Sequence, residues 1–429
     1  MSQQQLSRRD LLRTATAVAA ASSFAAIPAA ADEARPAGDG ALRRVDQILR
    51  QATESKVSPG IVAVAATDRG ILYEGAAGGV DMANGPPIGP DTIFWIASMT
   101  KAVTAAACMQ LVEQGKLQLD QEMGKLLPDL ASPKVLVGFD ASGAPQLRPA
   151  KRPITLRHLL THTSGFVYSI WDPLMLEYEK RTHEPFIGTC KVGALAAPLV
   201  FDPGDRWEYG IGIDWAGRAV EAISDQSLEV YFRENIFAPL GMTDTGFLIS
   251  SAQRARLATK YNRKADGSLE ASPFEMPQRP EFFMGGGGLF STPRNYLAFL
   301  QMLLHGGTFN RAQVLKPETV ALMGQNQIGD LNVVTLKTVW PELSNDANFF
   351  PGMVQKWGLS FDINTEPGPN GRSPGSLCWA GVFNTFFWID PTKRVTGTYL
   401  TQVLPFADAT SLKLYGEFER GIYDALKSA

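Results

Sequence analysis

The pattern of apolar and polar residues predicts β-strands near both ends of the chain. Residues 60–78 form two β-rich runs on either side of Asp68-Arg69-Gly70, an arrangement typical of a hairpin. Further β-rich runs, and segments in which apolar residues recur with helical spacing, also lie near the two ends of the chain. We expect strands within residues 358–364, 376–391 and 394–402, and helices over residues 40–55, 98–113 and 407–426.

The middle of the chain, about residues 117–279, has no clear strand pattern but contains two helix-start signals, in residues 154–162 and 212–224. The segment GGGGLFSTPRNYLAFLQMLL (285–304) then predicts a short strand and a helix, capped by Ser291 or Thr292. We therefore expect an α/β sandwich whose antiparallel sheet is built from both ends of the chain, with a helical insert between them. The sandwich domain would comprise residues 32–115 and 285–429, and the mainly helical insert domain residues 116–284.

Composition narrows the class of protein. The 429 residues are 45% hydrophobic and 19% charged, with a formal net charge of -3, which is typical of a globular protein. No basic run interleaves with aromatic residues, so we expect no nucleic-acid partner. No stretch reaches the roughly 18 apolar residues of a membrane span. Three distant cysteines form no zinc or disulfide pattern, and the sequence leaves open whether two of them pair after export. We expect neither a metal nor a cofactor.

Residues 1–31 have the features of a twin-arginine export signal. Arg8 and Arg9 precede an alanine-rich apolar stretch, and residues 29–31 offer a small-residue cleavage site. The alternative is a basic tail without a targeting role. The sequence therefore predicts a periplasmic or secreted protein.

Ser98 and Lys101 are candidates for a nucleophile and its base. Residues three apart at the start of a helix share one face, so the Lys101 amine can reach the Ser98 hydroxyl. A serine hydroxyl needs an adjacent base, and burial lowers the pKa of a lysine enough for it to serve. The motif alone is weak, because a serine and a lysine often begin a helix without any catalytic role.

Three other motifs are less convincing as catalytic or binding centres. GRSPG (371–375) matches the nucleophile elbow Gly-x-Ser-x-Gly, but Pro374 has no backbone N–H for an oxyanion and no histidine follows. We interpret it as a loop. HLLTH places His158 and His162 at helical spacing without the glutamate of a metalloprotease, so we expect structural roles for both. The glycine run 285–288 lacks the residues of a phosphate loop and favours close backbone packing beside a site.

Taken together and in order, five segments resemble a known family. They are Ser98-Met99-Thr100-Lys101, LLTHTSG (159–165), Tyr209, GGGGLFST (285–292) and Trp379-Ala380-Gly381 in a late strand. This set resembles the serine hydrolases of the class C β-lactamase and penicillin-binding protein superfamily, and most closely its family VIII carboxylesterases. The resemblance covers nearly the whole chain after the export signal, and it implies the β-lactamase-like α/β/α sandwich with a helical insert.

The resemblance also implies roles for individual residues. Ser98 would be the nucleophile, with Lys101 and Tyr209 as the proton-transfer groups, and it leaves open which of the two is the primary base. The oxyanion hole would be formed by the backbone N–H groups of Ser98 and Val382. The substrate-binding residues would be Trp379, Ala380 and Gly381, and Asp214 would be a supporting acidic residue.

Two departures from the family pattern bear on the substrate. The asparagine expected after Tyr209 is replaced by Gly210-Ile211, and Trp379 stands where β-lactamases carry a lysine. An indole supplies apolar surface and one N–H but no charge to pair with a carboxylate. Both departures favour neutral, hydrophobic esters. We expect an apolar acyl pocket lined by four aromatic residues, Phe94, Trp95, Phe386 and Phe387.

We therefore predict a serine carboxylesterase that cleaves short-chain hydrophobic esters through an acyl-enzyme on Ser98. Three alternatives stay open. One is a β-lactamase or D-amino-acid peptidase (a DD-peptidase) of the same superfamily, and the second is an acyltransferase in which an alcohol replaces water. The third, from another class, is a binding protein that kept the fold without the chemistry. A small-molecule ester is the expected partner, and the sequence leaves the oligomeric state open.

Overall fold

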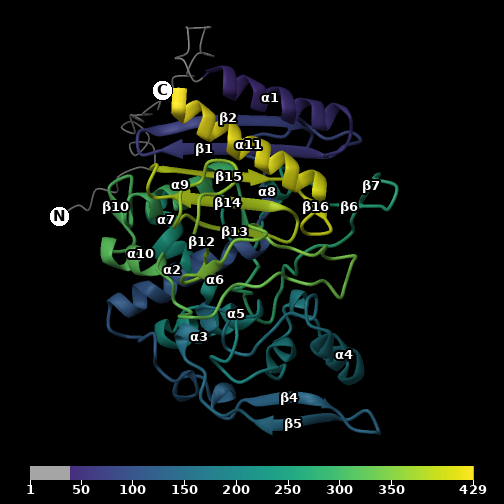
Figure 1. Cartoon of the computed structure of the whole chain (residues 1–429), viewed down its shortest axis with the longest axis vertical. Helices are drawn as coiled ribbons and strands as arrows, with labels where there is room; N and C mark the ends of the chain where they lie inside the picture. Colours follow the sequence, from purple (N-terminus) through teal and green to yellow (C-terminus); the bar gives the residue numbers. More distant parts are fainter. Residues whose placement is uncertain (1–38, 429) are drawn as a thin grey trace, which may run out of the picture. The chain divides into compact units, whose positions relative to one another are not determined.

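The computed structural model describes residues 39–428, so the predicted export signal lies outside the described residues. A seven-stranded sheet forms the centre of the fold, and every neighbouring pair in it is antiparallel (Figure 1). Strands from the two ends of the chain meet where β1 pairs with β15, as predicted. In order across the sheet, the strands are β11 (Gln355–Trp357), β12 (Asp362–Asn364), β13 (Leu377–Gly381), β14 (Thr385–Asp390), β15 (Val395–Leu400), β1 (Gly60–Thr67) and β2 (Gly70–Gly78).

Helices cover both faces of this sheet, because its strands carry apolar side chains on both sides. Phe386 in β14 stacks on Tyr415 of α11 (Ala409–Ser428), with ring centroids 4.6 Å apart. The next residue, Phe387, points to the other face and contacts Tyr296 of α9 (Pro293–Leu304). The helix α1 (Asp39–Glu54) packs beside α11. The structure thus has the predicted β-lactamase-like α/β sandwich.

The segment between residues 116 and 284 contains strands as well as helices. The hairpin β4–β5 and the pair β6–β7 were not predicted from the sequence. Strands β5 and β7 are short and largely exposed, so they lack the run of buried apolar residues that indicates a strand. Strand β6 also pairs with β16 near the C-terminus. The domain boundaries at residues 115 and 285 stay a prediction. The α-helices and strands of this segment are β4 (Lys134–Phe139), β5 (Pro145–Pro149), α3 (Leu156–Leu160), α4 (Pro173–Thr182), α5 (Gly212–Ser224), α6 (Leu228–Phe232), α7 (Ala238–Leu240), α8 (Ser251–Arg254), β6 (Tyr261–Arg263) and β7 (Leu269–Ala271). Strand β16, outside the segment, is Val403–Leu404.

Short elements complete the structure around the candidate nucleophile. β3 (Phe94–Trp95) pairs with β8 (Phe290–Ser291), which joins the chain before Ser98 to the chain after the glycine run. The helix α2 (Thr100–Glu113) is buried over most of its surface, and its alanine-rich sequence lets it pack closely against α5. The others are β9 (Thr308–Phe309), β10 (Ala312–Gln313) and α10 (Pro317–Met323). None of the helices in residues 39–428 has the length and apolar composition needed to span a bilayer.

Candidate active site

Ser98 and Lys101 lie at the entrance to α2. Ser98 belongs to a single 3₁₀ turn, Ala97–Met99, so the α-helix begins two residues later than the sequence predicts. Lys101 is 1% exposed, and its Nζ donates a hydrogen bond to Ser98 Oγ over 3.1 Å. A base and a nucleophile are therefore already in contact.

Two further acceptors hold the Lys101 amine. The hydroxyl oxygen of Tyr168 accepts a hydrogen bond from Nζ at 2.9 Å, and the carbonyl oxygen of Gly286 accepts one at 2.5 Å. Tyr168 was not predicted from the sequence. It lies three residues after LLTHTSG in a segment without a motif, and only the tertiary fold brings it to Lys101.

The glycine run surrounds this turn with backbone carbonyl groups. A Cβ on Gly286 would lie 2.5 Å from Asp214 Oδ2, so no side chain fits there without displacement. The close backbone approach expected from the sequence is present. Three consecutive carbonyls, of residues 285, 286 and 287, accept hydrogen bonds from Thr104 Oγ1, Lys101 Nζ and Trp95 Nε1 respectively.

Asp214 lies behind the glycine run, in the first turn of α5, and is fully buried. Its Oδ1 accepts a hydrogen bond from the backbone N–H of Gly286 at 2.7 Å, while its Oδ2 has no partner among residues 39–428. The carbonyl group of the same residue, in the next peptide unit, accepts the Lys101 hydrogen bond. Asp214 is thus linked to Lys101 through the backbone of Gly286, and its supporting role stays a prediction.

Tyr209 completes the group around Ser98. Its phenol oxygen accepts a hydrogen bond from Trp379 Nε1 over 2.9 Å, and Lys101 Nζ lies 4.8 Å from its ring centroid. His162 fixes the backbone beside it, because its Nδ1 accepts a hydrogen bond from the N–H of Gly210 and its ring lies 4.6 Å from that of Tyr209. The structural role expected for His162 is therefore to support this loop.

Burial sets the protonation states of these groups. Desolvation lowers the pKa of Lys101 to about 7, and the carboxylate of Asp214 partly opposes this shift. Burial raises the pKa of the Tyr209 phenol, while hydrogen bonding with Ser98 and Trp379 acts in the opposite direction. The pKa of Tyr168 is also raised by burial. Near neutral pH, Lys101 can therefore accept a proton while both phenols stay protonated.

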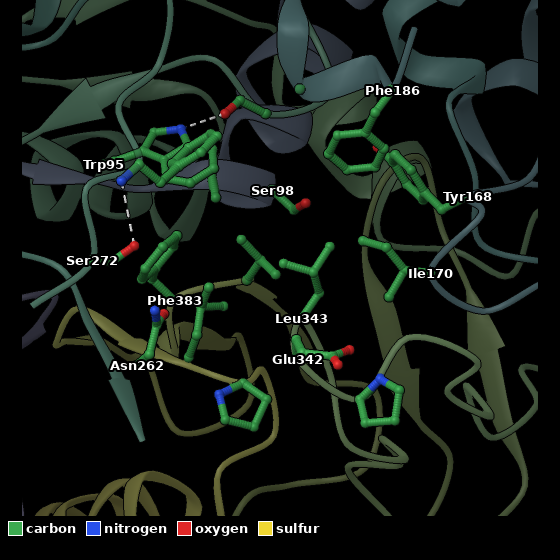
Figure 2. Close-up of a pocket in the computed structure, with 18 of the residues that line it drawn as sticks. Trp95, Ser98, Tyr168, Ile170, Phe186, Asn262, Ser272, Glu342, Leu343 and Phe383 are labelled. Carbon is green, nitrogen blue, oxygen red and sulfur yellow. Dashed lines mark hydrogen bonds between the residues drawn. The ribbon is translucent and has the colours of Figure 1, made fainter. Parts of the chain in front are cut away.

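A cavity of about 560 Å³ opens at Ser98, whose hydroxyl points into it (Figure 2). Its wall is largely apolar and includes Trp95, Ile170, Phe186, Leu343 and Phe383, all labelled in Figure 2. Of the four aromatic residues expected to line an acyl pocket, only Trp95 does so. Phe94 is buried in β3, and Phe386 and Phe387 pack under the helices of the sheet.

The end of β13 lies beside the nucleophile. A Cβ on Gly381 would come within 2.4 Å of the carbonyl oxygen of Ile96, so this strand end packs directly against the chain that precedes Ser98. Val382 follows it and lines the cavity together with Ser98. Trp379, Ala380 and Gly381 do not line the cavity, and the indole of Trp379 contacts Tyr209 instead. The oxyanion-hole role of Val382 stays a prediction, as does substrate binding by residues 379–381.

The other motifs have structural surroundings. GRSPG forms a loop, as predicted, in which buried Arg372 pairs with Glu419 at 2.6 Å. His158 completes the capping box at the start of α3 with Thr155. The three cysteines are buried and unbridged. Within residues 39–428, no cluster of histidine, cysteine and acidic residues is arranged to hold a metal ion.

Comparison with known proteins places this geometry in a family. The beta-lactamase family model matches residues 45–417. The chain is 33% identical over 427 residues to ML-236A carboxylate methylbutanoyltransferase of Penicillium citrinum, covering 95% of this chain and 99% of the relative. It is 31% identical over 384 residues to lovastatin esterase of Penicillium rubens, covering 86% of this chain and 94% of that relative.

Among solved structures, a mutant of simvastatin synthase from Aspergillus terreus superposes with a TM-score of 0.79 at 33% identity. The match covers 93% of this chain and 100% of that one. The fold, the buried Ser98–Lys101 pair and these matches agree with one another. The chain belongs to the β-lactamase family and is an enzyme of its serine hydrolase and acyltransferase superfamily.

Proposed function

We propose that the protein is an acyltransferase that moves a short acyl group from an ester or thioester, through Ser98, to the hydroxyl group of a bulky apolar alcohol. Hydrolysis of the acyl-enzyme, the carboxylesterase reaction, is its competing outcome. The observation that carries the proposal is the largely apolar cavity of about 560 Å³ at Ser98. Cavities of roughly 300–1,000 Å³ accommodate drug-sized ligands, so a short acyl group leaves most of this space for a second substrate.

The contacts of Lys101 and Tyr209 support the chemical steps. Ser98 Oγ attacks the acyl carbonyl and Lys101 takes the Ser98 proton, because its amine is buried and touches Oγ. Collapse of the tetrahedral intermediate breaks the bond to the leaving group, which receives a proton from Lys101 or Tyr209. The acceptor alcohol then attacks the carbonyl carbon of the acyl-enzyme and gives its proton to Lys101 or Tyr209. The bond between the acyl group and Ser98 Oγ breaks, and Oγ takes a proton back from the same groups.

The hydrogen bond from Trp379 supports a donor role for Tyr209. Since the indole N–H occupies one lone pair of the phenol oxygen, the phenol proton is free to point toward Ser98 or the leaving group. Trp379 also brings no charge to the site, which favours neutral acyl groups over β-lactams and peptide C-termini. Transfer is favoured over hydrolysis because relatives of similar length include a methylbutanoyltransferase.

Product partition tests this proposal. The protein is incubated with p-nitrophenyl butyrate and increasing concentrations of a bicyclic secondary alcohol, and the butyrate ester and free butyrate are quantified. We expect the new ester to exceed butyrate at millimolar alcohol, with the Ser98→Ala variant forming neither. Free butyrate as the sole product at every alcohol concentration would contradict transfer and leave a carboxylesterase. A chromogenic cephalosporin hydrolysed faster than the ester would favour the β-lactamase alternative.

A further inference from the structure

The wall of the cavity at Ser98 carries three charged side chains, of which two form ion pairs within the described part of the chain and one does not. They are Arg263, Lys264 and Glu342. The rest of the wall consists of apolar residues and uncharged polar groups such as Asn262 and Ser272. The charge that a substrate meets in this cavity therefore depends on how these three side chains are already paired.

Arg263 is occupied by the protein itself. Its Nε and Nη2 donate to both oxygens of Asp408, at 2.6 and 3.0 Å, and the Asp408 side chain is 5% exposed. Its Nη1 donates to the carbonyl oxygen of Gly267, and Nη2 also donates to that of Val57. The guanidinium fork that would bind a ligand carboxylate is thus already used.

Lys264 and Glu342 are the other two charged side chains of the cavity wall. Lys264 Nζ forms an ion pair with Glu270. Glu342 is exposed, and no side chain or backbone group in residues 39–428 forms a hydrogen bond or ion pair with it. Each cation of the wall is therefore matched by a carboxylate, and the charge left over is the negative charge of Glu342.

We infer that this site selects an alcohol without an anionic group, and that Glu342 favours an alcohol carrying an amine. The inference rests on the proposed function, because it concerns the alcohol part of the substrate of the same site. A carboxylate on the alcohol would meet no free cation in the wall and would be repelled by Glu342, whereas an ammonium group would find an unpaired carboxylate. Repulsion of the wrong charge is a common source of selectivity.

Matched esters test this selectivity. Butyrate esters of one bicyclic alcohol are prepared with a carboxylate, a methyl ester or a primary amine at the same distant position, and kcat/KM for cleavage is compared. We expect the order amine, methyl ester, carboxylate, with about a two- to fivefold step for the exposed charge. The Glu342→Lys variant should reverse the order of amine and carboxylate. Salt at 0.5 M, where the Debye length is about 4 Å against about 30 Å in 0.01 M buffer, should reduce the differences between the esters.

The control is Glu366→Lys, which changes the net charge equally at an exposed glutamate outside the cavity wall. This variant should leave the order of kcat/KM for the three esters unchanged. A carboxylate ester cleaved as fast as the methyl ester, or an amine-to-carboxylate ratio that Glu342→Lys does not change, would overturn the inference.

The outcomes separate this inference from the proposed function. Charge selection in ester cleavage without any transfer to free alcohols would contradict the acyltransferase proposal alone. If none of the esters is cleaved, the Ser98→Ala variant is titrated with the three free alcohols, and binding is followed by tryptophan fluorescence. Equal or tighter binding of the carboxylate would then overturn the charge preference on its own.

Discussion

Trp379 donates its indole N–H to the phenol oxygen of Tyr209 across 2.9 Å, in the interior of the protein. The resemblance described above implies that β-lactamases carry a lysine at this position. Here its polar atom is directed at a candidate catalytic residue, and its ring is enclosed by Trp357 and Phe349. The relationship makes Trp379 a positioning residue for Tyr209.

The Trp379→Phe variant tests this role. Phenylalanine keeps an aromatic ring but removes the N–H donor, so we expect kcat to fall about fivefold, since one buried hydrogen bond is worth about 1 kcal/mol. Trp388→Phe is the matched control, because Trp388 also donates to a buried tyrosine hydroxyl, that of Tyr423, among the residues packed on α11. Thermal unfolding should report a similar loss for both variants. An equal fall in kcat for Trp388→Phe would argue against a specific role for Trp379.

The pKa of Lys101 should determine the pH dependence of the reaction. Its pKa is lowered to about 7 by burial, so kcat/KM should rise with pH through this value as the amine loses its proton. The Asp214 carboxylate favours protonated Lys101, and Asp214→Asn removes the charge while leaving an oxygen to accept from Gly286. The midpoint of the pH profile should therefore move to lower pH in this variant. A midpoint that stays in place or rises would mean that Lys101 is not the titrating base.

The Tyr168 hydroxyl group accepts a hydrogen bond from Lys101 that was not predicted from the sequence. Tyr168→Phe removes the acceptor at 2.9 Å and leaves the contacts of Nζ with Ser98 and Gly286. We expect kcat/KM to fall about fivefold, the factor that corresponds to one lost hydrogen bond of about 1 kcal/mol. Tyr399→Phe removes a buried hydroxyl that has no partner among the described residues and serves as the control. Steady-state kinetics showing no difference between the two variants would exclude a role for the Tyr168 hydroxyl.

Gly286 is a further position where a small change should have a large effect. A Cβ there meets Asp214 Oδ2 at 2.5 Å, so Gly286→Ala must displace the backbone that links Asp214 to Lys101. Overpacking of this kind costs about 1–3 kcal/mol of stability. We expect that loss in denaturant unfolding, together with at least a tenfold lower kcat. Gly89→Ala, at a glycine with open space around it, should change neither.

Local sequence patterns predicted the scaffold well. The hairpin of residues 60–78 and the helix α9 follow from alternation and capping signals, and Thr292 accepts the capping hydrogen bond from Asn295. These features depend on neighbours in the chain. The strand-rich ends predicted one antiparallel sheet built from both ends of the chain, but they did not predict the order of its strands.

Tertiary contacts account for what the sequence did not predict. Tyr168 meets Lys101 only because the loop after α3 crosses the start of α2. The faces of Phe386 and Phe387 depend on the register of β14 with its neighbours, which the sequence pattern left open because both sides of the strand are apolar. The contact between the Trp379 indole and Tyr209 was not predicted either, because it depends on the path of β13 relative to the loop that carries Tyr209.

The most direct test of the central claim is intact-protein mass spectrometry after mixing with p-nitrophenyl butyrate. The account predicts that the wild-type protein gains the mass of one butyryl group, that the adduct maps to the peptide containing Ser98, and that a bicyclic alcohol removes it as the butyrate ester. Ser98→Ala should gain nothing. An adduct of the same size on the Ser98→Ala variant, or ester turnover that continues in it at the wild-type rate, would contradict an acyl-enzyme on Ser98.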